Sequence, residues 1–146
     1  MKLVIQRVLE AGVAIEGKEV ASIGRGLLVL VGVEDKDQEQ TAEKYFQKLI
    51  KLRIFEDAQG KTNLSIKDVG GSLLLVSQFT LMASCRDGNR PSFIGAGKPE
   101  RAKALYEYMV QLGKATEIPT EQGEFGADMK VRLVNDGPFT IILENL

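Results

Sequence analysis

Residues 131–146 read VRLVNDGPFTIILENL, and this stretch carries the pattern that decides the fold. Two apolar segments, 131–134 and 139–143, are typical of strands, and Asp136-Gly137 between them is a favoured two-residue hairpin turn. Pro138 is unexpected there, because it removes a backbone donor where a returning strand should begin to pair. The segment therefore predicts two strands joined by a turn that contains an unusual Gly137-Pro138 pair.

Upstream of this stretch, most of the chain also has a strand-like pattern. Strands are expected at 2–10, 12–16 and 19–23, and the apolar run 27–31 predicts a buried strand. Apolar residues at helical spacing predict one helix up to Ile50, capped by Asp37 or Thr41, and another that begins at Pro99. Short strands at 52–55 and 72–79 and further strands within 117–143 complete the pattern. The class expected is α+β, with two helices covering a curved, barrel-like, largely antiparallel sheet.

Composition and charge limit the kind of protein this can be. With 146 residues, 44% of them hydrophobic and 27% charged, the chain is expected to form a single domain over residues 1–146. Its 19 basic and 20 acidic residues give a net charge of -1, so any contact with nucleic acid should be local. A lone cysteine, Cys85, and no apolar run of 18 residues favour a cytoplasmic protein without a signal peptide or membrane span.

The chain contains no histidine, which removes much familiar enzyme chemistry. Ser-His-Asp and Cys-His catalysis are impossible, and so is a zinc site built from imidazole or several cysteines. We expect neither a metal nor a cofactor. Any catalysis must use hydroxyls, amides, carboxylates, backbone donors or groups of the substrate itself.

The least regular stretch, residues 80–98, follows a strand whose end changes from apolar to polar residues. Long loops at strand ends often carry function. Ser77, Gln78 and Thr80, together with backbone N–H groups leaving the sheet, are suited to stabilise a developing oxyanion. They are equally compatible with ordinary strand-end capping and a Ser/Thr turn. Gly137-Pro138 is likewise either a tight edge turn or, with a cis bond, a bare surface whose carbonyls accept hydrogen bonds from a ligand ammonium.

Two motifs, SQFTL at 77–81 and NDGPFT at 135–140, together resemble those of the D-aminoacyl-tRNA deacylase family in order and spacing. The resemblance extends along the chain through KLVIQRV at 2–8, GNRPSF at 88–93, KPERAKALYE at 98–107 and FGADMKV at 125–131. It implies a homodimer of barrel-like subunits. The implied reaction is hydrolysis of the ester that joins a D-amino acid to tRNA, or glycine mischarged on tRNA(Ala), while L-aminoacyl-tRNA is spared.

The resemblance also assigns roles to the Gly-Pro turn. Gly137 and Pro138 of one subunit would enter the pocket of the partner subunit, where their carbonyls would receive the substrate's α-ammonium. An L side chain would collide with this backbone, whereas a D side chain would point away. Arg7 would hold the turn, although it also fits an exposed arginine on a strand.

At the scissile ester the resemblance places Ser77, Gln78, Phe79 and Thr80. Backbone N–H groups of Phe79 and Thr80 are the favoured oxyanion donors. Thr80 as a nucleophile is the rival interpretation, ranked lower because no base is evident to activate it. Attack of water assisted by the neighbouring ribose hydroxyl of the substrate is the preferred mechanism.

The partner implied is the aminoacylated 3′ end of tRNA, with neither DNA nor membrane. Ala102, Phe125 and Met129 would lie at the terminal nucleotide, although 125–133 also reads as one strand with a core-facing side. Local phosphate attraction would come from basic residues: Arg86, Arg90, Lys98, Arg101 and Lys103. Cys85 and Asp87 stand at positions where members of the family often have polar or basic residues. A general Ser/Thr esterase and a non-catalytic aminoacyl-nucleotide binding module stay open as alternatives.

Overall fold

The computed structural model describes residues 1–146 and has two α-helices, one short 3₁₀ helix and eight strands. The expected α+β class is confirmed. In chain order the elements are β1 (Lys2–Ile15), β2 (Lys18–Ile23), β3 (Gly26–Gly32), α1 (Glu39–Ile50), β4 (Phe55–Glu56), β5 (Thr62–Leu64), β6 (Ser72–Ser77), η1 (Phe79–Met82), α2 (Pro99–Lys114), β7 (Thr120–Gln122) and β8 (Lys130–Leu143).

Strand β1 organises the sheet, because three other strands pair with it. One edge pairs antiparallel with β3 along 2–8 and then with β2 along 11–15. The other edge pairs antiparallel with β8 from Leu3↔Leu143 to Ala14↔Lys130. The break expected between strands 2–10 and 12–16 is wrong, because β1 runs through both. Gly12 lies inside β1, where a side chain would meet the Arg132 guanidinium at 2.8 Å.

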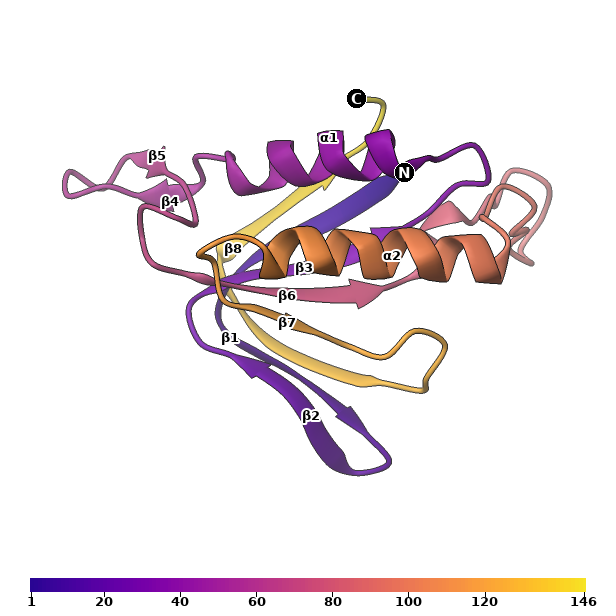
Figure 1. Cartoon of the computed structure of the whole chain (residues 1–146), viewed down its shortest axis with the longest axis horizontal. Helices are drawn as coiled ribbons and strands as arrows, with labels where there is room; N and C mark the ends of the chain where they lie inside the picture. The colour runs from indigo at the N-terminus through magenta and orange to yellow at the C-terminus, as the bar shows by residue number, and fades with distance from the viewer.

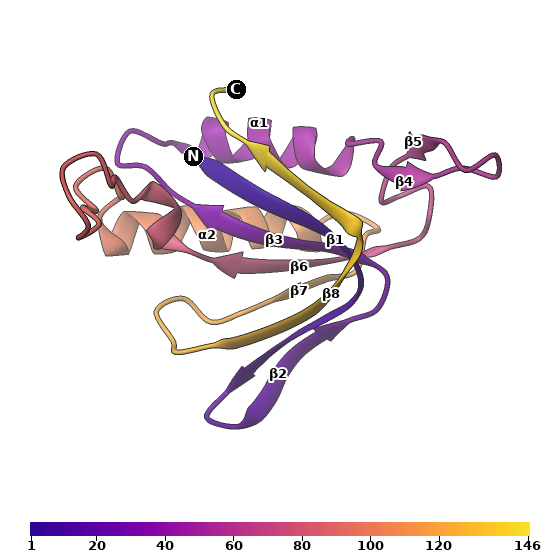
Figure 2. The same cartoon turned by 180° about the vertical axis from the view of Figure 1, so that it is seen from behind.

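Strands β3, β6 and β7 are mutually parallel, so the sheet is antiparallel on the β1 side and parallel beyond β3. Parallel neighbours require a crossover connection, and α1 and α2 lie in these two connections. Figures 1 and 2 show both helices on one face of the sheet, while β2 and the adjoining ends of β1 and β8 curl away beneath them. The strong curvature gives the sheet its barrel-like form.

Both faces of the central strands are buried. Leu27, Val29 and Val31 of β3 pack under the two helices, whereas Leu28 points into a smaller core inside the curl of the sheet. Strand β6 alternates in the same way, which explains why both strands are continuous apolar runs in the sequence. The end of β6 is thereby held rigidly where the polar residues begin.

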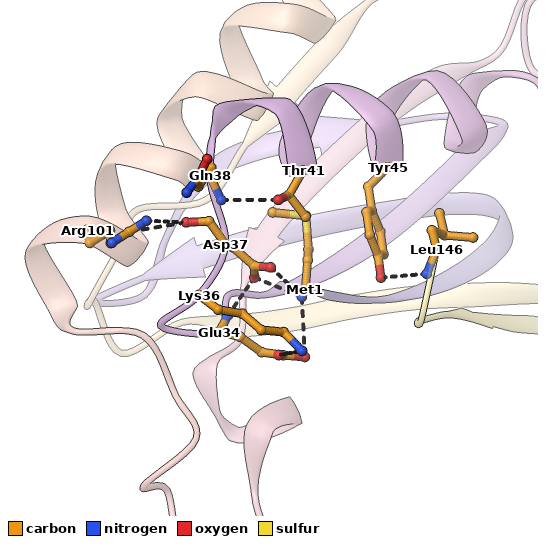
Figure 3. Close-up of polar contacts among 9 residues, drawn as sticks. All are labelled: Met1, Glu34, Lys36, Asp37, Gln38, Thr41, Tyr45, Arg101 and Leu146. Carbon is orange, nitrogen blue, oxygen red and sulfur yellow. Dashed lines mark hydrogen bonds and ion pairs between the residues drawn. The ribbon is translucent and has the colours of Figure 1, made fainter.

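The amino-terminal nitrogen of Met1 lies in a buried ionic cluster beside the start of α1. It donates to the Asp37 carboxylate at 2.8 Å and lies 3.3 Å from Glu34, as Figure 3 shows. Asp37 is 2% exposed and also accepts the Glu34 backbone N–H at 2.7 Å. The predicted caps of α1 are therefore wrong: Gln38 is the N-cap, and its N–H donates to the Thr41 hydroxyl.

Neither helix is long and apolar enough to cross a membrane.

Candidate active site

The Gly-Pro segment is a bulge in one strand, so the predicted hairpin is wrong. Both apolar halves of the segment belong to β8 and run in the same direction along β1. Asn135 pairs with Val8 and Thr140 with Gln6, which leaves residues 136–139 opposite Arg7 alone. The physical reason is the length of β1, whose free edge pairs with both halves and keeps them in line. A local turn signal cannot reveal this partner.

Asn135 closes the base of the bulge with its side chain. Its amide nitrogen donates to the Arg7 carbonyl at 2.9 Å and to the Phe139 carbonyl at 3.0 Å, and its amide oxygen accepts the Phe139 N–H at 3.2 Å. These bonds replace ladder contacts that the four residues of the bulge would otherwise lose. From the sequence, no role was assigned to Asn135. The only signal for it in the sequence was its position in the NDGPFT motif.

Arg7 fills the space behind the bulge and is 6% exposed, which excludes the exposed-arginine interpretation. Its guanidinium donates to the Ile54 carbonyl at 2.7 Å and to the Asp136 carbonyl at 3.1 Å, and it lies 3.3 Å from the Asp136 carboxylate. It also stacks over Phe139, with its central carbon 4.5 Å from the ring centre. Arg7 therefore contacts both sides of the Gly-Pro pair.

Gly137 and Pro138 are exposed at the crest of the bulge and are joined by a cis peptide bond. Gly137 has φ +141°, and a side chain there would come 2.9 Å from the Phe139 backbone nitrogen. Neither residue lines the pocket described next. The crest thus faces outward and lies outside the pocket of its own chain. It presents carbonyl oxygens as acceptors, and Pro138 has no N–H to donate.

A pocket of about 520 Å³ lies where β6 ends, between the start of α2 and the loop before β8. Apolar side chains form much of its wall, and polar groups enter from the end of β6, a composition typical of small-molecule binding sites. The lining residues are Val76, Ser77, Gln78, Phe79, Gly97, Pro99, Ala102, Phe125, Gly126, Ala127, Asp128, Met129 and Val131.

The segment 77–80 leaves the sheet at the pocket rim and exposes backbone donors. The Gln78 N–H still pairs with the Val31 carbonyl at 2.8 Å, and β6 ends there in the 3₁₀ turn η1. Among the turn and loop hydrogen bonds of the backbone, none is donated by the N–H of Phe79 or Thr80. Two adjacent unpaired N–H groups are thus available as donors, the kind of group that can stabilise an oxyanion.

Thr80 is exposed and does not line the pocket. Its hydroxyl oxygen accepts a hydrogen bond of 2.6 Å from the Gln78 side-chain amide. An amide N–H is a donor and cannot remove the hydroxyl proton, so this contact orders the side chain without activating it. No recorded side-chain hydrogen bond joins Thr80 to a carboxylate or an amine.

Residues 125–129 form a loop, so the strand expected over 125–133 begins only at Lys130. Gly126, at φ +79°, takes the chain through the turn. Phe125 and Met129 nevertheless reach the pocket from this loop, and Ala102 reaches it from the first turns of α2. The structure therefore brings Ala102, Phe125 and Met129 together with segment 77–79.

The five basic residues expected to attract phosphate fall into two groups. Arg101 donates to the Asp37 carbonyl at 2.6 and 3.1 Å, and Lys103 pairs with Glu107 at 3.9 Å. Arg86, Arg90 and Lys98 are exposed and form no ion pair. These three lie on the loop between η1 and α2, and Gly97 near the end of this loop lines the pocket.

The family model described as D-Tyr-tRNA(Tyr) deacylase matches residues 4–144. Proteins named D-aminoacyl-tRNA deacylase are 54% identical in Lactobacillus helveticus, over 99% of both chains, and 57% identical in Geotalea uraniireducens, over 99% of this chain and 93% of that one. The chain belongs to this deacylase family.

Solved structures agree with the family fold. A structure titled "c-Myc DNA Unwinding Element Binding Protein" superposes with a TM-score of 0.94 and 40% identity, covering 100% of this chain and 99% of that one. A second, titled as a probable eukaryotic D-amino acid tRNA deacylase, gives 0.83 at 18% identity, over 97% of each chain, which shows a shared fold.

Proposed function

We propose that this chain, as a single domain over residues 1–146, hydrolyses the ester of D-aminoacyl-tRNA and of glycine mischarged on tRNA(Ala), and spares L-aminoacyl-tRNA. The observation that carries the proposal is the segment 77–80, which presents two unpaired backbone N–H groups at the rim of a pocket in a chain of the deacylase family. An ester carbonyl seated there would develop its negative charge against fixed donors.

The proposed chemistry relies on the substrate for its base. Water attacks the ester carbon, and the Phe79 and Thr80 N–H groups stabilise the oxyanion that forms. The neighbouring ribose hydroxyl relays the proton of the water to the esterified ribose oxygen, which leaves as the acyl C–O bond breaks and releases the free amino acid. Ser77 and Gln78 border the ester, and the Gln78 amide holds Thr80 in place. Fixed backbone donors of this kind contribute roughly 10²–10³ in rate, without any side-chain base.

Stereoselection is assigned to the bulge of a second subunit. Gly137 and Pro138 are exposed and lie outside the pocket of their own chain, which supports a homodimer whose sites combine segment 77–80 of one protomer with the bulge of its partner. Their carbonyls would accept the substrate ammonium, and Arg7 and Asn135 would hold the bulge in place. An L side chain would then meet backbone that cannot retreat.

The remaining pocket is assigned to the 3′-terminal nucleotide of tRNA. Phe125 and Met129 offer apolar contact to a base, and Ala102 leaves room for it. The exposed Arg86, Arg90 and Lys98 are placed to attract nearby phosphates. An aminoacyl-tRNA substrate also favours action in the cytoplasm, where translation occurs.

Two other functions give different outcomes in the same assay. A general Ser/Thr esterase would cleave simple esters without tRNA, and a binding module would hold substrate without turnover. The related protein whose title names a DNA element raises DNA as a ligand, but a net charge of -1 provides no broad basic surface for a duplex.

The decisive experiment compares the purified protein on D-aminoacyl-, L-aminoacyl- and glycyl-tRNA of matched tRNA sequence. We expect release of the D-amino acid and of glycine, with L-aminoacyl-tRNA decaying at its spontaneous rate. Equal rates on both enantiomers would contradict stereoselection, and no turnover of any of the three would contradict the deacylase function.

A further inference from the structure

Tyr106 links three elements that meet behind the pocket. It lies on α2, one turn after the pocket residue Ala102, and is 1% exposed. Its hydroxyl oxygen lies 2.9 Å from the Leu75 carbonyl of β6 and 3.3 Å from the Gly123 carbonyl, where the loop to β8 begins. The Gly123 N–H in turn donates to the Leu75 carbonyl at 3.0 Å.

Tyr106, Leu75 and Gly123 form a triangle of polar contacts. The single phenol proton is donated to the Leu75 carbonyl at 2.9 Å and is shared with the Gly123 carbonyl at 3.3 Å. The Leu75 carbonyl oxygen has two lone pairs and can accept from both Tyr106 and the Gly123 N–H. Burial raises the pKa of Tyr106, and the hydroxyl therefore stays neutral and keeps the proton it donates. A buried, satisfied cluster of this kind fixes backbone positions strongly.

The triangle bears directly on the pocket wall. The Tyr106 ring packs against Phe125 with ring centres 6.2 Å apart. Met129 packs on Gly123 so closely that a methyl group added to Gly123 would lie 2.6 Å from the Met129 sulfur. Phe125 is therefore placed by the Tyr106 ring, and Met129 is placed by Gly123, the residue that the triangle anchors.

We propose that Tyr106 is a positioning residue for substrate binding, which holds Gly123 against β6 and so keeps Phe125 and Met129 in the shape that receives the terminal nucleotide. The identity of the substrate in this inference rests on the proposed deacylase function. The claim that Tyr106 anchors the loop at Gly123 does not. Tyr106 does not line the pocket and takes no part in the chemistry.

The test is Tyr106→Phe, with Tyr108→Phe as the matched control. Tyr108 lies on the same helix, and its hydroxyl donates to Glu43 of α1 at 2.5 Å, away from the pocket. Loss of one neutral hydrogen bond that preorganises the loop should raise KM for D-aminoacyl-tRNA roughly three- to tenfold in Tyr106→Phe. We expect kcat to stay within about twofold, because bound substrate re-forms the wall. Tyr108→Phe should leave both constants unchanged.

A second measurement needs no substrate. Amide hydrogen exchange across 123–129 should accelerate in Tyr106→Phe and stay at the wild-type rate in Tyr108→Phe. Should Tyr106→Phe fail to fold, Gly123→Ala keeps the hydroxyl and displaces Met129, and it should raise KM with kcat retained.

The outcomes separate this inference from the proposed function. Three results for Tyr106→Phe would each overturn the role of Tyr106. The first is amide exchange across 123–129 as slow as in Tyr108→Phe, the second is faster exchange with KM unchanged, and the third is a fall in kcat without a rise in KM. An inactive wild type would overturn the deacylase function, and the exchange experiment would still decide whether Tyr106 anchors the loop.

Discussion

At the scale of single residues, the most consequential observation is what surrounds the Thr80 hydroxyl. Its one side-chain partner is the Gln78 amide, which donates a hydrogen bond to it. A nucleophilic threonine would need an acceptor for its proton, and the chain has no histidine to supply one. The backbone N–H of Thr80 is, by contrast, free at the pocket rim. We therefore expect Thr80 to contribute to catalysis through its main chain.

Thr80→Ala should therefore retain most of its activity. We expect kcat on D-aminoacyl-tRNA to fall no more than about fivefold, the size of one lost hydrogen bond. A substrate that lacks the neighbouring ribose hydroxyl should be hydrolysed by wild-type protein on the order of 10²-fold more slowly. Single-turnover kinetics measures both effects, after circular dichroism has shown that the variant is folded.

A nucleophilic Thr80 gives the reverse pattern. Activity would disappear in Thr80→Ala, and an acyl-Thr80 adduct would be trapped during turnover. Detection of that adduct by mass spectrometry would replace the substrate-assisted mechanism while leaving family membership intact.

At the scale of elements, the bulge of β8 depends on a few side chains that replace the strand ladder. Four residues stand opposite Arg7. Two hydrogen bonds between the Asn135 amide and the Phe139 backbone join the two ends of the bulge, and a third, to the Arg7 carbonyl, ties its base to β1. Arg7 supports the bulge from behind through the Ile54 and Asp136 carbonyls. The crest can therefore project while the strand on either side remains paired.

Asn135→Ala removes the bonds at the base of the bulge. We expect the free energy of unfolding to fall by about 1–3 kcal/mol, because the Arg7 and Phe139 carbonyls lose their donor. The ratio of D- to L-aminoacyl-tRNA hydrolysis should fall as well. Urea unfolding and paired deacylation assays measure the two effects.

Asn63→Ala is the matched control for that variant. Asn63 is also half-buried and hydrogen-bonded, but it lies in the β4–β5 hairpin. Its loss should leave the D-to-L ratio unchanged. An unchanged ratio in both variants would show that the bulge is held without Asn135.

The ionic cluster at the start of α1 is a second element held by side chains. Asp37→Asn leaves the buried Met1 ammonium with Glu34 alone, at 3.3 Å. Breaking a buried pair is costly, and we expect a loss of about 3 kcal/mol in the free energy of unfolding, measured in urea. Asp35→Asn, an exposed neighbour, should change it by less than about 0.5 kcal/mol. Equal midpoints for the two variants would contradict a stabilising role for the pair.

Elements defined by their own periodicity were predictable from the sequence, and elements defined by a distant partner were not. The apolar runs gave β3 and β6, and Pro99 marked the first residue of α2. The NDGP segment has the local chemistry of a turn, but β1 pairs with both of its flanks and makes it a bulge. The strand predicted over 125–133 was also wrong in its first residues. Gly126 has a positive φ and turns the chain into a loop there.

The candidate site shows the same division. Ser77, Gln78 and Phe79 follow directly from a strand whose end becomes polar, and they do line the pocket. Tyr106 looked like an ordinary core residue at helical spacing, because a hydroxyl's partners on β6 and in the loop are visible only after folding. Sequence alone likewise could not separate Arg101, tied to the Asp37 carbonyl, from the free Arg86.

At the scale of the whole molecule, one chain holds the two halves of the proposed site on different surfaces. The crest at Gly137-Pro138 is exposed, and the pocket at segment 77–79 opens elsewhere. The proposed composite site between two protomers would bring the two halves together, and it would imply an isologous dimer with two equivalent sites.

Mixed dimers test this arrangement. Gly137→Ala disturbs the crest, because its methyl group meets the Phe139 backbone, and Ala102→Leu fills the pocket. Each variant alone should be nearly inactive. After subunit exchange in an equal mixture, half of the dimers are hybrids with one intact site each, so activity should return to about a quarter of the wild-type value.

Exchange itself is followed by native mass spectrometry of differently tagged subunits. Hybrids that form without any recovery of activity would argue that each site is built within a single chain.

Pairing of β1 with β8 has a consequence for the order in which the molecule is built. The first strand synthesised, β1, cannot complete its pairing until the last strand, β8, has been made, since Leu3 pairs with Leu143 and Ala14 with Lys130. Contacts so distant along the chain slow folding, because a long loop must close before any of them forms. During translation, β2, β3 and both helices can assemble on β1 while its other edge stays open to wrong partners. The bulge appears only when β8 closes that edge on both sides, so the surface proposed to tell mirror-image amino acids apart is the last part of the protein to take shape.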